Sequence, residues 1–306
     1  MIKRVLCFTN PAYLSLHLQQ IVYEPPATKS ETDSDNAEKQ TRIIPIEDVG
    51  VVILDNRQIT ITQALMAALL ENNCAVITTD SRHLPIGLLL PLAGNSLQSE
   101  RFRKQLDASE PLKKQMWQQT IVAKILGQAA ILQEVGIENA NMRTWAKSVR
   151  SGDPENLEGR AAAYYWRNVF QNQDFIRGQE GDPPNNLLNY GYAIVRAMMA
   201  RALVAAGLLP TLGIHHHNRY DTYCLADDIM EPYRPYVDRL VLSMLKHHND
   251  ISELTTDIKR DLLSISTADV IIDGYRSPMI VAIQTTANSV QRCLCGESRK
   301  IIYPDW

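Results

Sequence analysis

The segment that decides the fold reads Leu84-Pro85-Ile86-Gly87-Leu88-Leu89-Leu90-Pro91-Leu92-Ala93-Gly94-Asn95, and it stands between two stretches with different hydrophobic patterns. Two prolines and two glycines in so short a run are typical of a hinge between domains. Before the segment the apolar residues follow the short period of strands, and after it they follow the longer period of helices. We therefore expect an N-terminal domain over residues 1–92 and a C-terminal domain over residues 93–306.

The N-terminal domain is expected to be small and rich in strands. Residues 16–23 alternate between apolar and polar side chains, which predicts one half-buried strand. A polar stretch over residues 29–41 predicts a mobile loop, and Thr62 is a candidate N-cap for the one helix. Further strand signals lie at 2–8, 43–46, 51–54, 59–61 and 75–79. The pattern predicts a β-sandwich-like domain.

The C-terminal domain is expected to be larger and all-α, which makes the fold class α+β. Asp153-Pro154-Glu155 combines an N-cap, a proline and an acidic first turn, so a helix is expected to begin at Pro154. Pro232 and Pro235 lie near the start of another helix and predict an irregular turn there. The expected helices cover 98–108, 112–135, 154 onward, 186–206 and 225–247.

Composition sets limits on the class of protein. The 306 residues are 45% hydrophobic and carry a formal net charge of −3, so binding to DNA would need a local basic patch rather than an excess of charge. The odd number of cysteines indicates reduced thiols and a cytoplasmic protein, and Cys293-x-Cys295 lacks the partners of a zinc site. Without a signal sequence or a long apolar run, no membrane association is expected.

Glu158 is the first residue with a candidate chemical role. On a helix that begins at Pro154, its same-face neighbours are Ala161, Ala162 and Tyr165. A carboxylate among such residues is costly to bury unless a positive group lies opposite. An arginine partner or partial exposure is the structural explanation, and a bound cation is the functional one.

A histidine triplet and an acidic cluster form a second candidate. The triplet covers residues 215–217, and Asp227-Asp228-Ile229-Met230-Glu231 follows it. Asp228 and Glu231 share a helix face, although an acidic helix start alone would explain such carboxylates. From these residues alone, the choice of histidine and of acidic residue stays open.

Two carboxylates and an imidazole suit Mg²⁺ or Mn²⁺ better than a closed zinc site. Such a set leaves coordination positions for phosphate oxygens and water, which phosphodiester chemistry requires. Arg160, Tyr165 and Arg234 lie in the same segments and are candidate DNA contacts, because arginine pairs with phosphate and aromatic rings stack on bases. The structural explanation for these three residues is a solvated or packed helix face.

Several segments, in a fixed order, resemble the CRISPR-associated endonuclease family that integrates new spacers, the Cas-one family. They are Asn156-Leu157-Glu158-Gly159-Arg160-Ala161-Ala162, Leu188-Asn189-Tyr190-Gly191-Tyr192, Gly207-Leu208-Leu209-Pro210, Gly213-Ile214-His215-His216 and Leu225-Ala226-Asp227-Asp228-Ile229-Met230-Glu231-Pro232-Tyr233-Arg234-Pro235. His83-Leu84-Pro85, and Lys124 with Gln128 after Trp117, are similar to the type II-like branch, which accompanies an RNA-guided effector nuclease.

The resemblance implies a metal-dependent DNA endonuclease and integrase. Its metal ligands would be Glu158, His216 and Glu231, with Asp228 as the reserve for the third position. The 3′-hydroxyl of a short foreign duplex would attack a phosphodiester in a CRISPR repeat array, which serves adaptive immunity against phage and plasmids. The implied partners are double-stranded DNA (prespacer and repeat array), a second copy forming a homodimer through the β domains, a small dimeric partner subunit and the effector nuclease.

Two other functions fit the same residues. One is a metal-dependent phosphohydrolase or nuclease unrelated to CRISPR, although such helical sites usually draw histidines from several helices. The other is a non-catalytic scaffold that bridges DNA and whose acidic cluster only caps a helix. Metal-dependent joining of DNA would separate the integrase from the scaffold.

Overall fold

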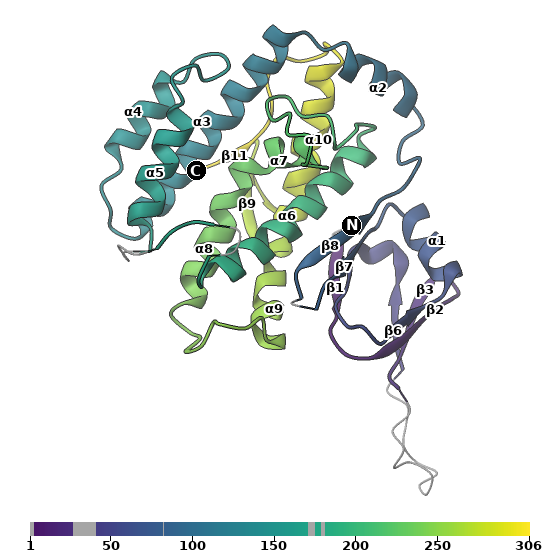
Figure 1. The fold of residues 1–306 in the computed structure, drawn as a ribbon. Coiled ribbons are helices and arrows are strands. Elements are labelled where there is room, and N and C mark those ends of the chain that lie inside the picture. The colour runs from purple at the N-terminus through teal and green to yellow at the C-terminus, as the bar shows by residue number, and fades with distance from the viewer. Residues whose placement is uncertain (1–2, 27–40, 82, 171–174, 179–180) are drawn as a thin grey trace, which may run out of the picture. The chain divides into compact units, whose positions relative to one another are not determined.

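The computed structural model describes residues 3–26, 41–81, 83–170, 175–178 and 181–306. The chain divides into two compact units, Met1–Gly94 and Asn95–Trp306, whose elements are labelled in Figure 1. The loop expected over 29–41 lies outside the described residues except for Thr41. No helix in the described ranges is long and apolar enough to cross a membrane.

The first unit contains two four-stranded sheets, in the orders β1-β5-β7-β8 and β4-β3-β2-β6. In the first sheet β1, β5 and β7 are parallel and β8 is antiparallel. In the second, β2, β3 and β4 are antiparallel, and β6 is parallel to β2. The elements are β1 (Arg4–Phe8), β2 (Ala12–His17), β3 (Gln20–Glu24), β4 (Arg42–Pro45), η1 (Ile46–Asp48), β5 (Val49–Leu54), β6 (Ile59–Ile61), α1 (Gln63–Glu71), β7 (Ala75–Thr79) and β8 (Pro85–Leu89).

Both sheets and α1 contribute to one hydrophobic core. Leu14 from β2, Val52 from β5 and Leu65 from α1 belong to the same buried cluster. Burial of such side chains is the main favourable term in folding. The Thr62 side chain accepts a hydrogen bond from Leu65 N and caps α1, as predicted.

The strand predicted over residues 16–23 is wrong, because the chain reverses there. β2 and β3 form a hairpin in which His17 faces Gln20. Leu18 and Gln19, with φ angles of 46° and 59°, form the two-residue turn. Tight hairpins normally place glycine or asparagine at such angles, so the sequence contains no turn signal.

The segment expected to be only a hinge includes the strand β8. Pro85 is its first residue, and β8 is the edge strand beside β7. Proline is tolerated at the start of an edge strand because no ladder hydrogen bond is lost there. Gly87 is required by the pairing, since a Cβ there would lie 2.5 Å from Thr78 Oγ1.

The second unit is mainly helical. Helix α6 is buried along most of its length, with Leu187, Ile194 and Leu203 fully inaccessible. It packs against α7, α8 and α10, while α3 packs against α4, α5 and η2 (Figure 1). The elements are α2 (Gln98–Leu106), α3 (Glu110–Glu134), α4 (Ala140–Ser148), α5 (Leu157–Asn168), α6 (Asn185–Ala205), α7 (Cys224–Met230), η2 (Glu231–Tyr233), α8 (Arg234–Met244), α9 (Thr256–Leu263), η3 (Ser264–Thr267), β9 (Asp269–Ile272), β10 (Tyr275–Pro278), α10 (Met279–Leu294) and β11 (Pro304–Asp305).

The expectation that this part is all-α is wrong in one respect. Strands β9, β10 and β11 form a small antiparallel sheet in the order β10-β9-β11. β10 is charged and short, and β11 has two residues, so neither shows the apolar alternation that identifies a strand in a sequence. The broader prediction of an α+β protein, with sheets first and helices after them, is confirmed.

Candidate metal centre

The start of α5 fixes the position of Glu158. The Asp153 carboxylate accepts hydrogen bonds from Leu157 N and Glu158 N, and the Asn156 side chain accepts one from Gly159 N. Asp153 and Asn156 have φ angles of 48° and 50°, so α5 begins at Leu157 and not at Pro154 as predicted. The capped first turn presents Glu158 with its side chain 22% exposed.

Lys124 joins the two glutamates that were predicted to bind metal. It lies in the middle of α3, and its Nζ is 2.6 Å from Glu158 Oε1 and 2.6 Å from Glu231 Oε2. The three side chains are 11%, 22% and 8% exposed, respectively. Burial alone would lower the pKa of Lys124, but the neighbouring Glu231 and Glu158 raise it above its ordinary value. The two carboxylates therefore converge on one positively charged atom.

Glu231 is held from its other side by Arg234. Glu231 opens η2, and Arg234, three residues later, places its Nε 2.9 Å from Glu231 Oε1. The pair lies where proline interrupts the α7–α8 segment, as the two prolines predicted. Burial alone would raise the pKa of Glu231, but Arg234 and Lys124 outweigh it and lower that pKa to about 2. Glu231 is therefore an ionised carboxylate in a nearly closed environment.

The histidine loop is organised around Asp228 of α7, whose side chain is fully buried. Asp228 Oδ2 accepts hydrogen bonds from Ile214 N at 2.7 Å and from His215 N at 2.9 Å. Asp228 Oδ1 lies 2.5 Å from His216 Nδ1. The close approach of the loop to α7 requires glycine at residue 213, since a Cβ there would lie 2.9 Å from Asp228 Oδ2 and 3.0 Å from Cys224 Cβ.

His216 is the histidine of the triplet whose ring these contacts hold, through Nδ1 and Asp228 Oδ1. Its hydrogen bond to Asp228 raises its pKa above 6.5, and Glu231 and Glu158 act in the same direction. No described residue donates to or accepts from its Nε2. A buried carboxylate on one imidazole nitrogen is the usual support of a metal-binding histidine, because it fixes the ring and leaves the second nitrogen to the metal.

Trp117 of α3 holds the His215 ring and so keeps His215 from serving as the metal-binding histidine. The two rings are stacked, with centroids 4.1 Å apart and an interplanar angle of 2°. Burial is the largest cause of the lowered pKa of His215, and the neighbouring His216 adds to it. His215 therefore anchors the loop to α3 as a neutral ring.

The residues fit a divalent cation in donor type and charge. Two carboxylates converge on one cation position. With the imidazole that Asp228 supports, they make an oxygen-rich set of the kind Mg²⁺ and Mn²⁺ accept. As the side chains stand, no three histidine, cysteine, aspartate or glutamate residues in the described ranges are grouped closely enough to hold a metal. Lys124 occupies the position between the two carboxylates. Asp228 contacts His216 directly, so its geometry suits a positioning residue more than a third ligand.

Two of the three predicted DNA contacts lie in the protein interior. Tyr165 is fully buried, and its hydroxyl donates to Asp238 Oδ2 at 2.8 Å, so the prediction that it stacks on DNA is wrong. Arg234 is engaged with Glu231 and lies 4.7 Å from the Tyr192 ring. Arg160 is exposed on α5 beside Trp145, at 5.9 Å from its ring. Of the three, Arg160 is the one open to a DNA backbone.

Lys124 is the residue of the site to which the sequence motifs had assigned no chemical role. It is the one charged residue between Lys114 and Glu134 in an otherwise apolar and amide-rich stretch. A charge in the middle of such a helix indicates a buried partner, and that signal would have placed it opposite the glutamates.

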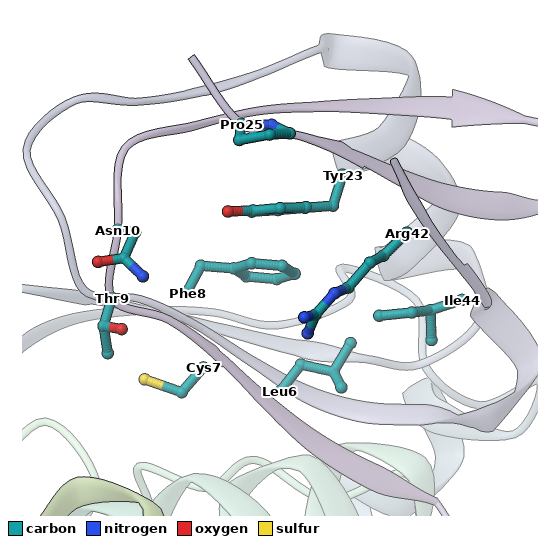
Figure 2. A pocket seen from close by; sticks show the side chains of 9 residues that line it. All are labelled: Leu6, Cys7, Phe8, Thr9, Asn10, Tyr23, Pro25, Arg42 and Ile44. Atoms are coloured by element: carbon teal, nitrogen blue, oxygen red, sulfur yellow. The ribbon is translucent and has the colours of Figure 1, made fainter. Parts of the chain in front are cut away.

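A separate pocket of about 420 Å³ lies within the first unit and includes none of the predicted site residues. Figure 2 shows the Phe8 and Tyr23 rings lying one above the other, with the Arg42 side chain beside Phe8. The ring centroids are 5.9 Å apart. The chemistry described above belongs wholly to the second unit.

Comparison with known proteins gives consistent relationships. A family described as CRISPR associated protein Cas1 matches residues 6–257. The CRISPR-associated endonuclease Cas1 of Neisseria meningitidis serogroup C (strain 8013) is 36% identical over 299 residues, which cover 97% of this chain and 94% of that protein.

Solved structures share the fold at lower identity. A casposase bound to its integration product has a TM-score of 0.77 at 20% identity, over 98% of this chain and 92% of that one. A Cas6-RT-Cas1–Cas2 complex has a TM-score of 0.74 at 18% identity, over 100% of this chain and 36% of the matching chain.

Proposed function

The chain belongs to the CRISPR-associated protein Cas1 family, and from this premise we propose that it is a divalent-metal-dependent integrase that joins short DNA duplexes to a CRISPR repeat array. The observation that carries the proposal is the convergence of Glu158 and Glu231 on one cation position, together with a histidine ring held through Nδ1 by a buried carboxylate. A scaffold with a capped acidic helix would not need a second, distant glutamate turned toward the first.

The metal ion would be Mg²⁺ or Mn²⁺, held by Glu158, Glu231 and His216. When bound, it would neutralise phosphate charge and lower the pKa of an attacking hydroxyl. With a DNA 3′-hydroxyl as the nucleophile the outcome is joining by transesterification, and with water it is cleavage. The O–P bond formed replaces the O–P bond broken, so joining needs no external energy source.

The chain's own residues prepare this site. Asp228 holds the His216 ring by Nδ1 and so presents Nε2, while Arg234 fixes one oxygen of Glu231. Arg160, exposed two residues after Glu158, is suited to hold a backbone phosphate near the site. Preorganised charges of this kind lower the barrier because they need no rearrangement during the reaction.

The proposed partners follow from the relatives. The casposase structure contains an integration product and the Cas6-RT-Cas1 structure contains Cas2, which supports double-stranded DNA and a small Cas2-like subunit as partners of this chain. We also propose a homodimer formed through the first unit and an association with an RNA-guided effector nuclease, both of which the family resemblance implies.

A matched pair of variants tests the function. Glu158→Gln removes one carboxylate from the convergence, and we expect at least a hundredfold loss of Mn²⁺-dependent joining of a labelled duplex to a repeat-bearing plasmid, on the order of 3 kcal/mol in barrier height. Glu155→Gln alters an exposed glutamate paired with Arg150 and should join DNA at the wild-type rate. Equal rates for Glu158→Gln and the wild type would rule out the proposed site.

A further inference from the structure

The buried ammonium group of Lys124 occupies the space between the two proposed metal-binding glutamates. Its Nζ lies 2.6 Å from an oxygen of each, and its side chain is only 11% exposed. A salt bridge so short and so enclosed is not a surface pairing that water would weaken. Without the ammonium, the buried carboxylate of Glu231 and the partly exposed one of Glu158 would have no positive charge between them.

Of the two cations that contact Glu231, Lys124 rather than Arg234 is placed where a metal ion could replace it. Arg234 binds Glu231 through Oε1, and Lys124 binds the same residue through Oε2. Arg234 can therefore stay while a new cation takes the second oxygen. Lys124, by contrast, contacts the very oxygens of Glu158 and Glu231 that face each other. An ammonium and a divalent ion cannot both occupy that space.

We propose that Lys124 is a built-in counter-cation, which holds Glu158 and Glu231 together in the metal-free protein and has to be displaced when a divalent ion binds. This inference rests on the proposed function, because it takes the glutamate pair as the metal site. It makes Lys124 a positioning residue that lowers metal affinity while it stabilises the metal-free fold. The lysine side chain is long and flexible, so the displaced ammonium can turn toward solvent or toward a DNA phosphate.

Charge balance supports an exchange rather than an addition. The two glutamates already pair with two cations, Lys124 and Arg234. A divalent ion added beside both cations would meet repulsion from the nearer one. If the ion replaces Lys124 between the carboxylates, it meets two unshielded oxygens.

The test measures metal binding directly and not activity. Mn²⁺ is titrated into wild-type protein and into Lys124→Met, and free Mn²⁺ is followed by electron paramagnetic resonance. We expect Lys124→Met to bind Mn²⁺ about tenfold more tightly or better, which corresponds to about 1.4 kcal/mol. Its melting temperature without metal should fall, and Mn²⁺ should raise that temperature by more than it does in the wild type.

Two control variants separate charge from other effects. Lys104→Met removes an exposed lysine that pairs with Glu100 on α2, and it should bind Mn²⁺ as the wild type does. Lys124→Arg keeps the positive charge and should not bind Mn²⁺ more tightly than the wild type. If Lys124→Met does not fold, Lys124→Gln replaces it in the titration, because glutamine also removes the positive charge at residue 124 and keeps a polar side chain.

The possible outcomes distinguish this inference from the function on which it rests. Mn²⁺ binding to Lys124→Met that is equal to or weaker than wild-type binding would overturn the displacement, while the metal site itself would stand. Wild-type protein that binds no Mn²⁺, with no change on Glu158→Gln, would overturn the metal site and the displacement together. Tighter binding in both Lys124→Met and Lys124→Arg would mean that side-chain shape matters rather than charge, and this too would overturn the inference.

Discussion

At the scale of single residues, the site depends on carboxylates with different tasks. Glu158 and Glu231 face one cation, whereas Asp228 faces the backbone of the histidine loop. The three carboxylates are chemically alike, and their tasks differ only because of what lies opposite each. Spacing alone left Asp228 and Glu231 as rivals for the same role, and the contacts give each a separate one.

Asp228→Asn should weaken both the fold and the site. The amide group turns one acceptor oxygen into a donor, so either Ile214 N and His215 N lose their acceptor, or His216 Nδ1 becomes the acceptor and its proton moves to Nε2. We expect a loss of about 2 kcal/mol or more in the free energy of unfolding, measured by urea denaturation. Joining activity should fall by about ten- to a hundredfold, as when the support of a metal-binding histidine is removed.

Asp250→Asn is the control for this variant, since Asp250 is exposed and accepts hydrogen bonds from Ser252 N and Ser252 Oγ. An Asp228→Asn protein as stable and as active as Asp250→Asn would contradict the role given to Asp228. Loss of activity without any loss of stability would limit that role to the histidine ring.

At the scale of elements, three helices meet at one buried carboxyl group. Asp238 of α8 accepts hydrogen bonds from Tyr165 of α5 and Tyr192 of α6. Burial raises the pKa of Asp238 from 3.8 to about 6, against the opposing effect of the two tyrosine hydrogen bonds. The junction that supports Arg234 and Tyr192 therefore responds to pH.

The sign of that response follows from linkage. The folded protein binds the Asp238 proton more tightly than the unfolded chain does, so this contribution is complete below about pH 4 and is lost as the pH rises through about 6. The difference between the two pKa values corresponds to about 3 kcal/mol. Asp238→Asn cannot ionise, so its stability relative to the wild type should rise between about pH 4 and pH 7, measured by urea denaturation at both. A constant difference between the two proteins would show that Asp238 does not titrate in this range.

The packing of α6 on α8 allows no side chain at residue 191. A Cβ on Gly191 would lie 2.4 Å from Val237 Cγ1, and valine has little freedom to move. Gly191→Ala should therefore lower the free energy of unfolding by about 1–3 kcal/mol. Adding Val237→Ala should recover part of that loss, and purely additive effects in denaturation would show that the two residues do not clash.

Helices and strands with a strong apolar period could be predicted from the sequence. Turns and strands that form only through contacts with distant parts of the chain could not. The buried α6 and the capped α1 follow from apolar spacing and from Thr62. The turn at Leu18 and Gln19 contradicts ordinary turn preferences, and β11 exists only because it pairs with β9. The carboxylates of the site could be named in advance. The lone charge of Lys124 in an apolar stretch indicates a buried partner, but it does not say which carboxylates that partner comprises.

At the scale of the whole molecule, all residues of the candidate metal centre lie in the second unit, which has its own core. A fragment covering residues 95–306 should therefore unfold cooperatively and bind Mn²⁺ with an affinity close to that of the full chain. Because we assign dimer formation to the first unit, the fragment should sediment as a monomer in analytical ultracentrifugation. A fragment that stays helical and still dimerises would refute that assignment, and one that cannot fold would show that the units depend on each other.

The residues of the metal centre come from elements that lie far apart in the sequence, and this matters while the protein is being synthesised. Lys124, Glu158, His216 and Glu231 come from α3, α5, a loop and η2, and Asp228 of α7 holds the backbone of that loop and the His216 ring. A ribosome-bound chain, or one cut short by a premature stop before α7, has neither an oriented histidine nor a second glutamate. Under the proposed function, a chain cut short before α7 therefore has no complete metal centre and is expected to cut no DNA.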